Sequence, residues 1–130
     1  MMRILSLACA AAMALAAATM PARADLRLLM VEQQGCAYCI MWEKQIGPIY
    51  PKTSEGRAAP LRKESLRALP DDITLRSKPQ FTPTFILLRD GVELRRIEGY
   101  PGEDFFWGLL GKMLENQPEW IAQLNGDAEG

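Results

Sequence analysis

The spacing of apolar and polar residues changes along the chain, and each spacing predicts one kind of element. The run LRLLMV, residues 26–31, is apolar at strand length and favours a strand buried on both faces. Gln33-Gln34-Gly35 predicts a turn, and the next segment predicts a helix over residues 36–46. Gly47-Pro48 ends that helix, because proline cannot continue the hydrogen-bond ladder.

The middle of the chain has a weaker pattern. Residues 47–60 contain three prolines and two glycines, so they predict a loop or an interrupted helical segment. Residues 61–66 suit a second strand, and residues 70–80 predict irregular structure. No internal repeat or low-complexity segment stands out.

The C-terminal half is regular again. Residues 84–88 predict a strand, Asp90-Gly91 a tight hairpin turn, and residues 92–97 a returning strand of alternating apolar and charged residues. Apolar residues then recur at helical spacing over residues 103–116. The remaining tail predicts one short turn and fraying residues. Strands that alternate with helices and end in a hairpin and a helix indicate an α/β domain with helices flanking a sheet.

The first 24 residues have the pattern of a secretory signal peptide. Arg3 precedes an uncharged apolar run, and Ala22-Arg23-Ala24 has the small-x-small form of a cleavage site. The run is too short for a bilayer span, which needs about 20 apolar residues. We therefore expect cleavage after Ala24, no stable membrane insertion, and one domain over residues 25–130, with an uncleaved anchor as the alternative.

Cleavage changes the charge and the cysteine count. Loss of Arg3 and Arg23 lowers the basic count from 15 to 13 against 16 acidic side chains, so the net charge goes from -1 to -3. This balance argues against nucleic-acid binding, which needs a basic surface. Of the three cysteines, Cys9 is removed, and Cys36 and Cys39 remain in a compartment where disulfides persist.

Cys36 and Cys39 stand three residues apart at the start of the predicted helix. Unpaired N–H groups and the helix dipole at that end stabilise an anion, so the thiolate of Cys36 should be favoured. Cys39 lies one turn further on and can close a disulfide. A zinc site needs four ligands, and the chain has no histidine, so no metal or cofactor is expected. A permanent structural disulfide remains an alternative, but a bond between Cys36 and Cys39 closes so short a loop that it would stabilise the fold weakly.

A second motif follows about 45 residues later. In Phe81-Thr82-Pro83-Thr84-Phe85 a proline precedes a buried strand, where it marks a special backbone shape at the strand's entry. Spacing alone favours a trans bond before Pro83, because only about 5–6% of X-Pro bonds in folded proteins are cis.

CAYC at a helix start, TPTFILLRDG and EGY before a C-terminal helix together resemble the thioredoxin superfamily over residues 26–114. The resemblance implies a thioredoxin-like fold, with a mixed sheet of about four strands flanked by helices. It also implies that Cys36 attacks, that Cys39 resolves, and that Pro83 is a cis-proline. Thr82 would bind an extended substrate segment, with Gly99 near the same surface and Tyr38 exposed between the cysteines.

The longer segment PIYPKTSEGRAAPLRKESL is similar to SoxS-type periplasmic thioredoxin-like proteins of sulfur-oxidising bacteria. That similarity implies a monomeric reductant that receives electrons from a membrane thiol transporter and reduces a protein disulfide in the carrier complex SoxYZ. The chain departs from ordinary thioredoxins at two points: Met30 replaces their buried acid, and Ala37-Tyr38 separates the cysteines.

The motif alone leaves open an oxidant or isomerase, and a binding module with a static disulfide. Five further positions carry expectations of their own. Trp42 should pack in the core, and Trp107 either packs or binds a partner. The sequence leaves open whether Tyr50 approaches the active site, and Arg95-Arg96 should be solvated.

Overall fold

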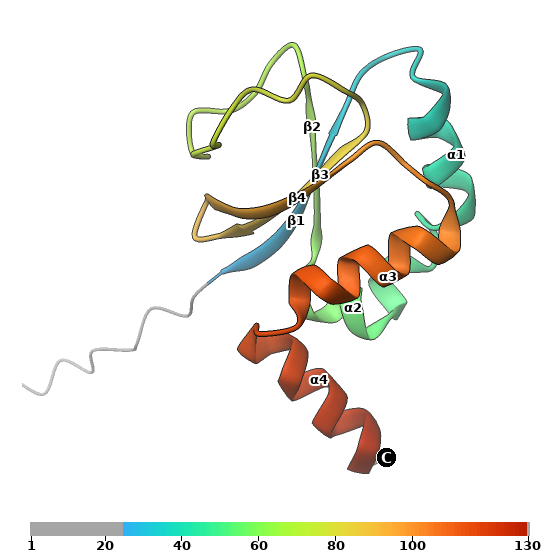
Figure 1. Cartoon of the computed structure of the whole chain (residues 1–130), viewed down its shortest axis with the longest axis vertical. Coiled ribbons are helices and arrows are strands. Elements are labelled where there is room, and N and C mark those ends of the chain that lie inside the picture. Colours follow the sequence, from blue (N-terminus) through green and yellow to red (C-terminus); the bar gives the residue numbers. More distant parts are fainter. Residues whose placement is uncertain (1–24, 130) are drawn as a thin grey trace, which may run out of the picture.

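Four strands form one mixed sheet, in the order β2-β1-β3-β4, in a computed structural model that describes residues 25–129 (Figure 1). The predicted signal peptide lies outside the described residues. The elements in chain order are β1 Leu26–Glu32, α1 Ala37–Gln45, the 3-10 helix η1 Tyr50–Lys52, α2 Ser54–Ala58, β2 Leu61–Ser65, β3 Thr84–Arg89, β4 Val92–Glu98, α3 Glu103–Leu114 and α4 Pro118–Glu129.

The strand directions follow from the connections. β1 and β2 are parallel because α1, η1 and α2 carry the chain back across the sheet between them. β3 runs antiparallel to both β1 and β4, and the tight turn at Asp90-Gly91 joins it to β4. Asp90 and Gly91 both have positive φ, 52° and 81°, as this kind of hairpin turn requires. The predicted mixed sheet of four strands is confirmed.

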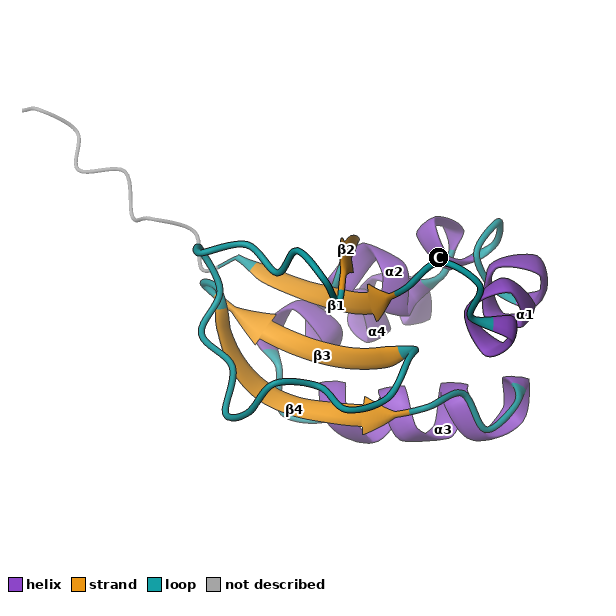
Figure 2. Cartoon of the chain, turned by 90° about the horizontal axis from the view of Figure 1, so that it is seen from above, coloured by secondary structure: helices purple, strands orange, loops and turns teal. Residues whose placement is uncertain are grey.

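Both faces of the two central strands are buried, as the continuous apolar runs in β1 and β3 predict. One face packs against the helices through a cluster that includes Met30, Trp42, Phe85 and Phe106. The other face is covered by the loop between β2 and β3, which supplies partly buried leucine and isoleucine side chains. Figure 2 shows the sheet with the helices on one side of it and this loop on the other.

Two expectations were wrong. The C-terminal tail forms the 12-residue helix α4 rather than a short turn, and long-range contacts hold it in place: Arg89 of β3 bonds Glu119 and Gln117. Arg96 is not a solvated cation, because its side chain is only 14% exposed and pairs with the buried carboxylate of Glu93 at 2.6 Å.

None of the helices described over residues 25–129 has the length and hydropathy needed to cross a bilayer. α3 and α4 have 12 residues each.

Candidate redox site

The turn after β1 and the first residue of α1 set up the site. Gly35 takes a positive φ of 79°, and the Cys36 amide donates to the Gln33 carbonyl at 3.3 Å, which closes the turn. Cys36 is the residue that caps α1, with extended backbone angles, so the helix itself begins at Ala37. The predicted position of the cysteine pair at a helix N-terminus is therefore confirmed.

Cys36 and Cys39 form a disulfide, with their Cα atoms 5.2 Å apart. The Cys39 amide donates to the Cys36 sulfur at 3.1 Å, so this sulfur occupies the position of a helix N-cap acceptor. Cys36 is half-buried, whereas Cys39 is 4% exposed. The two sulfurs therefore differ in access and in hydrogen bonding: Cys36 is reachable and stabilised as an acceptor, and Cys39 is covered.

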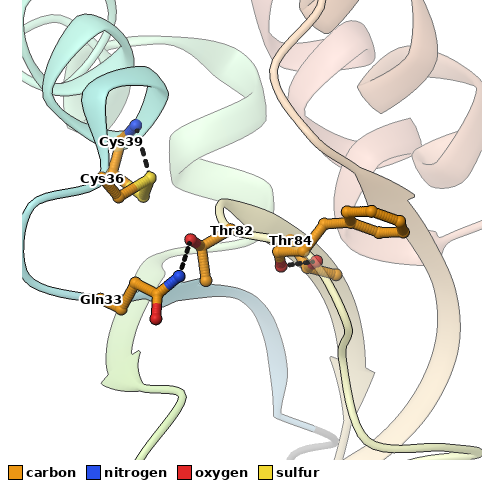
Figure 3. The surroundings of a disulfide bond; sticks show 6 residues. Gln33, Cys36, Cys39, Thr82 and Thr84 are labelled. Atoms are coloured by element: carbon orange, nitrogen blue, oxygen red, sulfur yellow. Dashed lines mark hydrogen bonds between the residues drawn. A yellow bond between two sulfur atoms is a disulfide. The ribbon is translucent and has the colours of Figure 1, made fainter.

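The loop before β3 lies against the disulfide (Figure 3). The Thr82-Pro83 peptide bond is cis, as the resemblance implied and as spacing alone did not. Pairing of Val31 with Thr84 brings the start of β3 beside the end of β1, and hence beside the turn that leads to Cys36. The Thr84 hydroxyl donates to the Phe81 carbonyl at 2.6 Å and holds the loop in shape.

Gln33 is a contact of the site that the sequence did not suggest. Its side-chain amide donates to the Thr82 hydroxyl oxygen at 2.9 Å, and Figure 3 shows the bond beneath the disulfide. The bond joins the cysteine turn directly to the cis-proline loop. Gln33 and Thr82 are 49 positions apart, so no local sequence pattern predicts this hydrogen bond.

Two hollows have residues of the segment 32–44 in their lining. The first, of about 570 Å³, reaches both cysteines, and its charged lining residues are Glu32, Glu43 and Lys44. The second, of about 510 Å³, we name the aromatic groove. It is lined by Tyr38, Phe81, Thr82, Glu98, Gly99, Tyr100 and Pro101.

The aromatic groove gathers several of the residues expected at the site. Tyr38, Thr82 and Gly99 all line it, and Tyr38 is 58% exposed. Phe81, which sequence reasoning left out, lines it too and is 60% exposed. A large apolar side chain directly before the Thr-Pro pair was the signal that could have drawn attention to it.

Tyr50 does not take part in the site. It is fully buried, its hydroxyl donates to the Ala59 carbonyl at 2.7 Å, and its ring stacks on Trp107 with 6.2 Å between ring centroids. Burial, with a smaller contribution from Glu55, raises the pKa of Tyr50 well above its ordinary value. Tyr50 and Trp107 therefore have packing roles, as does the fully buried Trp42.

Met30 lies in the core opposite Phe85 and is fully buried, so the position that holds an acid in ordinary thioredoxins is apolar here. The nearest carboxylate along the strand, Glu32, lines the 570 Å³ hollow together with Cys39. Within residues 25–129, no group of three or more histidine, cysteine, aspartate or glutamate side chains is arranged to hold a metal ion.

A disulfide between helix-start cysteines, beside a cis-proline on a four-stranded mixed sheet, defines a thioredoxin-like thiol–disulfide oxidoreductase. The crystal structure of the reduced form of periplasmic thioredoxin SoxS from Paracoccus pantotrophus is similar to the chain, with 51% sequence identity and a TM-score of 0.68. The match covers 70% of this chain and 97% of that one. The chain therefore belongs to the thioredoxin family, as a SoxS-type member. No protein-family model and no curated protein sequence matches it.

Proposed function

We propose that the chain is an exported, periplasmic reductant that attacks protein disulfides through Cys36 and resolves the intermediate through Cys39. The observation that carries these roles is the asymmetry of the pair. Cys36 is the accessible sulfur and accepts the Cys39 N–H at 3.1 Å, whereas Cys39 is 4% exposed. A hydrogen bond to an ionised group is stronger than one to a neutral group, so this bond favours the Cys36 thiolate in the reduced state.

The reaction conserves atoms and electrons over two exchanges. In the reduced protein the Cys36 thiolate attacks one sulfur of the partner disulfide, which gives a mixed disulfide and one partner thiolate. The Cys39 thiolate then attacks the Cys36 sulfur and releases the second partner thiolate. Two electrons pass from the dithiol to the partner, whose thiolates take up protons, and the chain is left with the Cys36–Cys39 disulfide seen here.

Thr82, Pro83 and Tyr38 are proposed to bind the partner segment beside Cys36. Within the described residues no main-chain hydrogen bond engages Thr82, so its N–H and C=O can pair with an extended segment. Pro83 is buried and cannot offer an N–H, which confines the pairing to Thr82. Tyr38 is exposed and lines the same groove as Thr82.

The family and the N-terminal sequence support one physiological setting for this reaction. Residues 1–24 serve as a signal peptide, and residues 25–130 act as a monomeric domain in the periplasm. The SoxS-like character supports the carrier complex SoxYZ as the reduced partner and a membrane thiol transporter as the electron donor. The chemistry uses two cysteines and needs no bound cofactor.

Trapping tests the roles of the two cysteines. Reduced Cys39→Ser protein, mixed with a disulfide-bonded partner, should accumulate a mixed disulfide through Cys36 that non-reducing electrophoresis and mass spectrometry detect. Reduced Cys36→Ser protein is the matched control and should trap nothing. Equal trapping by both variants, or none by either, would contradict the proposed roles and favour a binding module with a static disulfide.

The reduction potential of the Cys36–Cys39 pair tests the direction of electron flow. Equilibration of the chain in dithiothreitol or glutathione buffers should give a value toward the thioredoxin end of the range, about -270 mV. A value near -120 mV, typical of a strong oxidant, would refute the reductant proposal while leaving the two exchanges intact.

A further inference from the structure

The loop that leads to the cis-proline is long and depends on β4 for its position. It runs over residues 66–83, between β2 and β3, on the face of the sheet away from the helices (Figure 2). The Thr74 amide donates to the Gly91 carbonyl at 2.7 Å, and the Glu93 amide donates to the Thr74 carbonyl at 3.0 Å. Loops longer than about 12–15 residues without regular structure are usually functional when they are ordered.

A buried carboxylate fixes the next part of this loop. The Glu93 side chain is only 1% exposed, and it accepts the Arg76 amide at 2.8 Å and the Arg96 guanidinium at 2.6 and 2.7 Å. The same guanidinium donates to the Ser77 carbonyl at 2.8 Å. Arg96, held by Glu93, is therefore a bridge between β4 and the main chain of the loop.

Stability alone does not account for an ion pair at this place. Replacement of a buried ion pair by apolar side chains of similar volume often leaves stability unchanged or raises it. Apolar side chains would, however, leave the main-chain N–H of Arg76 and the C=O of Ser77 without these partners. What the ion pair adds is a fixed path for the loop at these two residues.

The segment after Ser77 depends on its two ends. Within the described part of the chain, no hydrogen bond between main-chain groups involves residues 78–82. Arg96 holds one end at Ser77, and at the other end the Pro83 carbonyl accepts the Gly99 amide at 2.8 Å. Thr82 is the last residue of this span, so its position depends on both anchors.

We propose that Glu93 and Arg96 are positioning residues of the reaction, which fix the segment that presents the Thr82 main chain to the partner. Arg96 bonds the Ser77 carbonyl directly, and Glu93 acts through Arg96 and the Arg76 amide. The inference rests on the proposed function, because the pairing of Thr82 with the partner is what needs a fixed loop. Both residues act through the loop rather than on the reacting sulfurs, so a loosened anchor weakens partner binding and leaves the exchange chemistry in place.

Arg96→Lys tests the anchor, because lysine keeps the positive charge but lacks the planar fork that bonds a carboxylate and a loop carbonyl together. The KM of the reduced chain for a disulfide-bonded peptide should rise roughly fivefold, as for one lost hydrogen bond, and kcat should change less than about twofold. Hydroxyethyl disulfide has no peptide main chain to pair with Thr82, so its kcat/KM should stay at the wild-type value. An unchanged peptide KM, or an equal loss with both substrates, would overturn the proposal.

Arg95→Lys is the matched control, because Arg95 is the neighbouring arginine of β4 and bonds the Lys112 carbonyl of α3 at 3.1 Å instead of the loop. It should keep the peptide KM of the wild-type chain. Gly56→Ala places a Cβ against the Tyr50 main chain, outside the loop, and should also keep the peptide KM while the chain is folded. A rise in either control equal to that in Arg96→Lys would refute a role specific to the anchor.

A double variant tests whether Glu93 and Arg96 form one anchor. Glu93→Gln alone should raise the peptide KM by a similar factor, roughly fivefold. The combination of Glu93→Gln with Arg96→Lys should raise it little further, because effects within one hydrogen-bond network are not additive. Multiplied effects would refute a shared anchor. A wild-type chain that reduces neither the peptide nor hydroxyethyl disulfide would instead contradict the proposed function itself.

Discussion

The side-chain amide of Gln33 donates a hydrogen bond of 2.9 Å to the hydroxyl oxygen of Thr82, and so connects the turn that holds Cys36 to the cis-proline loop. Thr82 is the residue proposed to pair with the main chain of the partner. The bond occupies an acceptor site of the Thr82 hydroxyl and fixes how the loop faces the disulfide. Gln33 therefore acts on the reaction by positioning Thr82 and does not need to touch the reacting sulfurs.

Replacement of Gln33 by alanine should weaken partner binding more than it slows chemistry. Loss of one hydrogen bond between neutral groups costs about 1 kcal/mol, which corresponds to a rise in KM of roughly fivefold for a peptide disulfide. The value of kcat should change less, because the cysteine turn keeps its own hydrogen bond from Cys36 to Gln33 main chain. Steady-state kinetics with a disulfide-bonded peptide measure both constants.

The adjacent Gln34→Ala variant is the control, because Gln34 is exposed in the same turn and makes no side-chain hydrogen bond among the described residues. It should keep the KM of the wild-type chain. Gln33→Asn has the same amide on a shorter side chain and should restore little of the binding. Equal KM values for Gln33→Ala and Gln34→Ala would contradict the positioning role.

The part of the fold that local patterns describe could be predicted from the sequence. The apolar run of β1, the Asp90-Gly91 turn and the helical spacing of α3 each depend on neighbours within a few residues, and the structure confirms all three elements. The cysteine pair at a helix N-terminus was predictable for the same reason, because a glycine turn and a following helix are local signals.

The missed features depend on residues far apart in the chain. α4 has few apolar residues, and Arg89, about 30 positions earlier, helps to hold it through Glu119. The alternating pattern of β4 predicts a solvated Arg96, and only the structure shows that Arg96 pairs with the buried carboxylate of Glu93. The Gln33–Thr82 bond and the cis bond before Pro83 likewise have no local pattern, and only family resemblance pointed to the second.

Gly56 should be required for the short helix α2 to fold against η1. A Cβ at this position would overlap the main-chain carbonyl oxygen of Tyr50, which cannot move without disturbing the core. Gly56→Ala should therefore lower the free energy of unfolding by about 2–3 kcal/mol, measured by urea denaturation. Gly108→Ala in α3, where a Cβ meets no atom within 4 Å, should raise it by about 0.5–1 kcal/mol. A neutral Gly56→Ala variant would contradict this account.

The buried ion pair of Glu93 and Arg96 should make stability depend on pH. The hydrogen bond from Arg96 is the main cause that lowers the pKa of Glu93 in the folded chain, and the Arg76 amide adds a bond at 2.8 Å. A lowered folded-state pKa stabilises the chain above the unfolded-state value, about 4.3, and this contribution is lost as the pH falls through the folded-state pKa.

The Glu93→Gln variant isolates that contribution. The difference in free energy of unfolding between wild type and Glu93→Gln should be about 3 kcal/mol at pH 7 and should shrink below pH 4, as urea denaturation at several pH values would show. Glu98→Gln removes an exposed carboxylate 3.9 Å from the same arginine and should cost less than about 1 kcal/mol. A difference for Glu93→Gln that stays constant from pH 7 to pH 3 would refute the electrostatic origin.

The asymmetry between the two cysteines should appear in their alkylation rates. In the reduced chain we expect Cys36 to keep its half-buried, accessible position and the Cys39 N–H donor, whereas Cys39, in the first turn of α1, is only 4% exposed. A hydrogen bond to an ionised group contributes about 1.5–3 kcal/mol, so limiting iodoacetamide at pH 7 should label Cys36 at least roughly tenfold faster than Cys39. Peptide mapping by mass spectrometry measures the two rates, and in concentrated urea they should converge because both helix and burial are lost. Equal rates in the folded chain would show that the helix N-terminus does not distinguish the sulfurs, and the assignment of Cys36 as the attacking residue would fail.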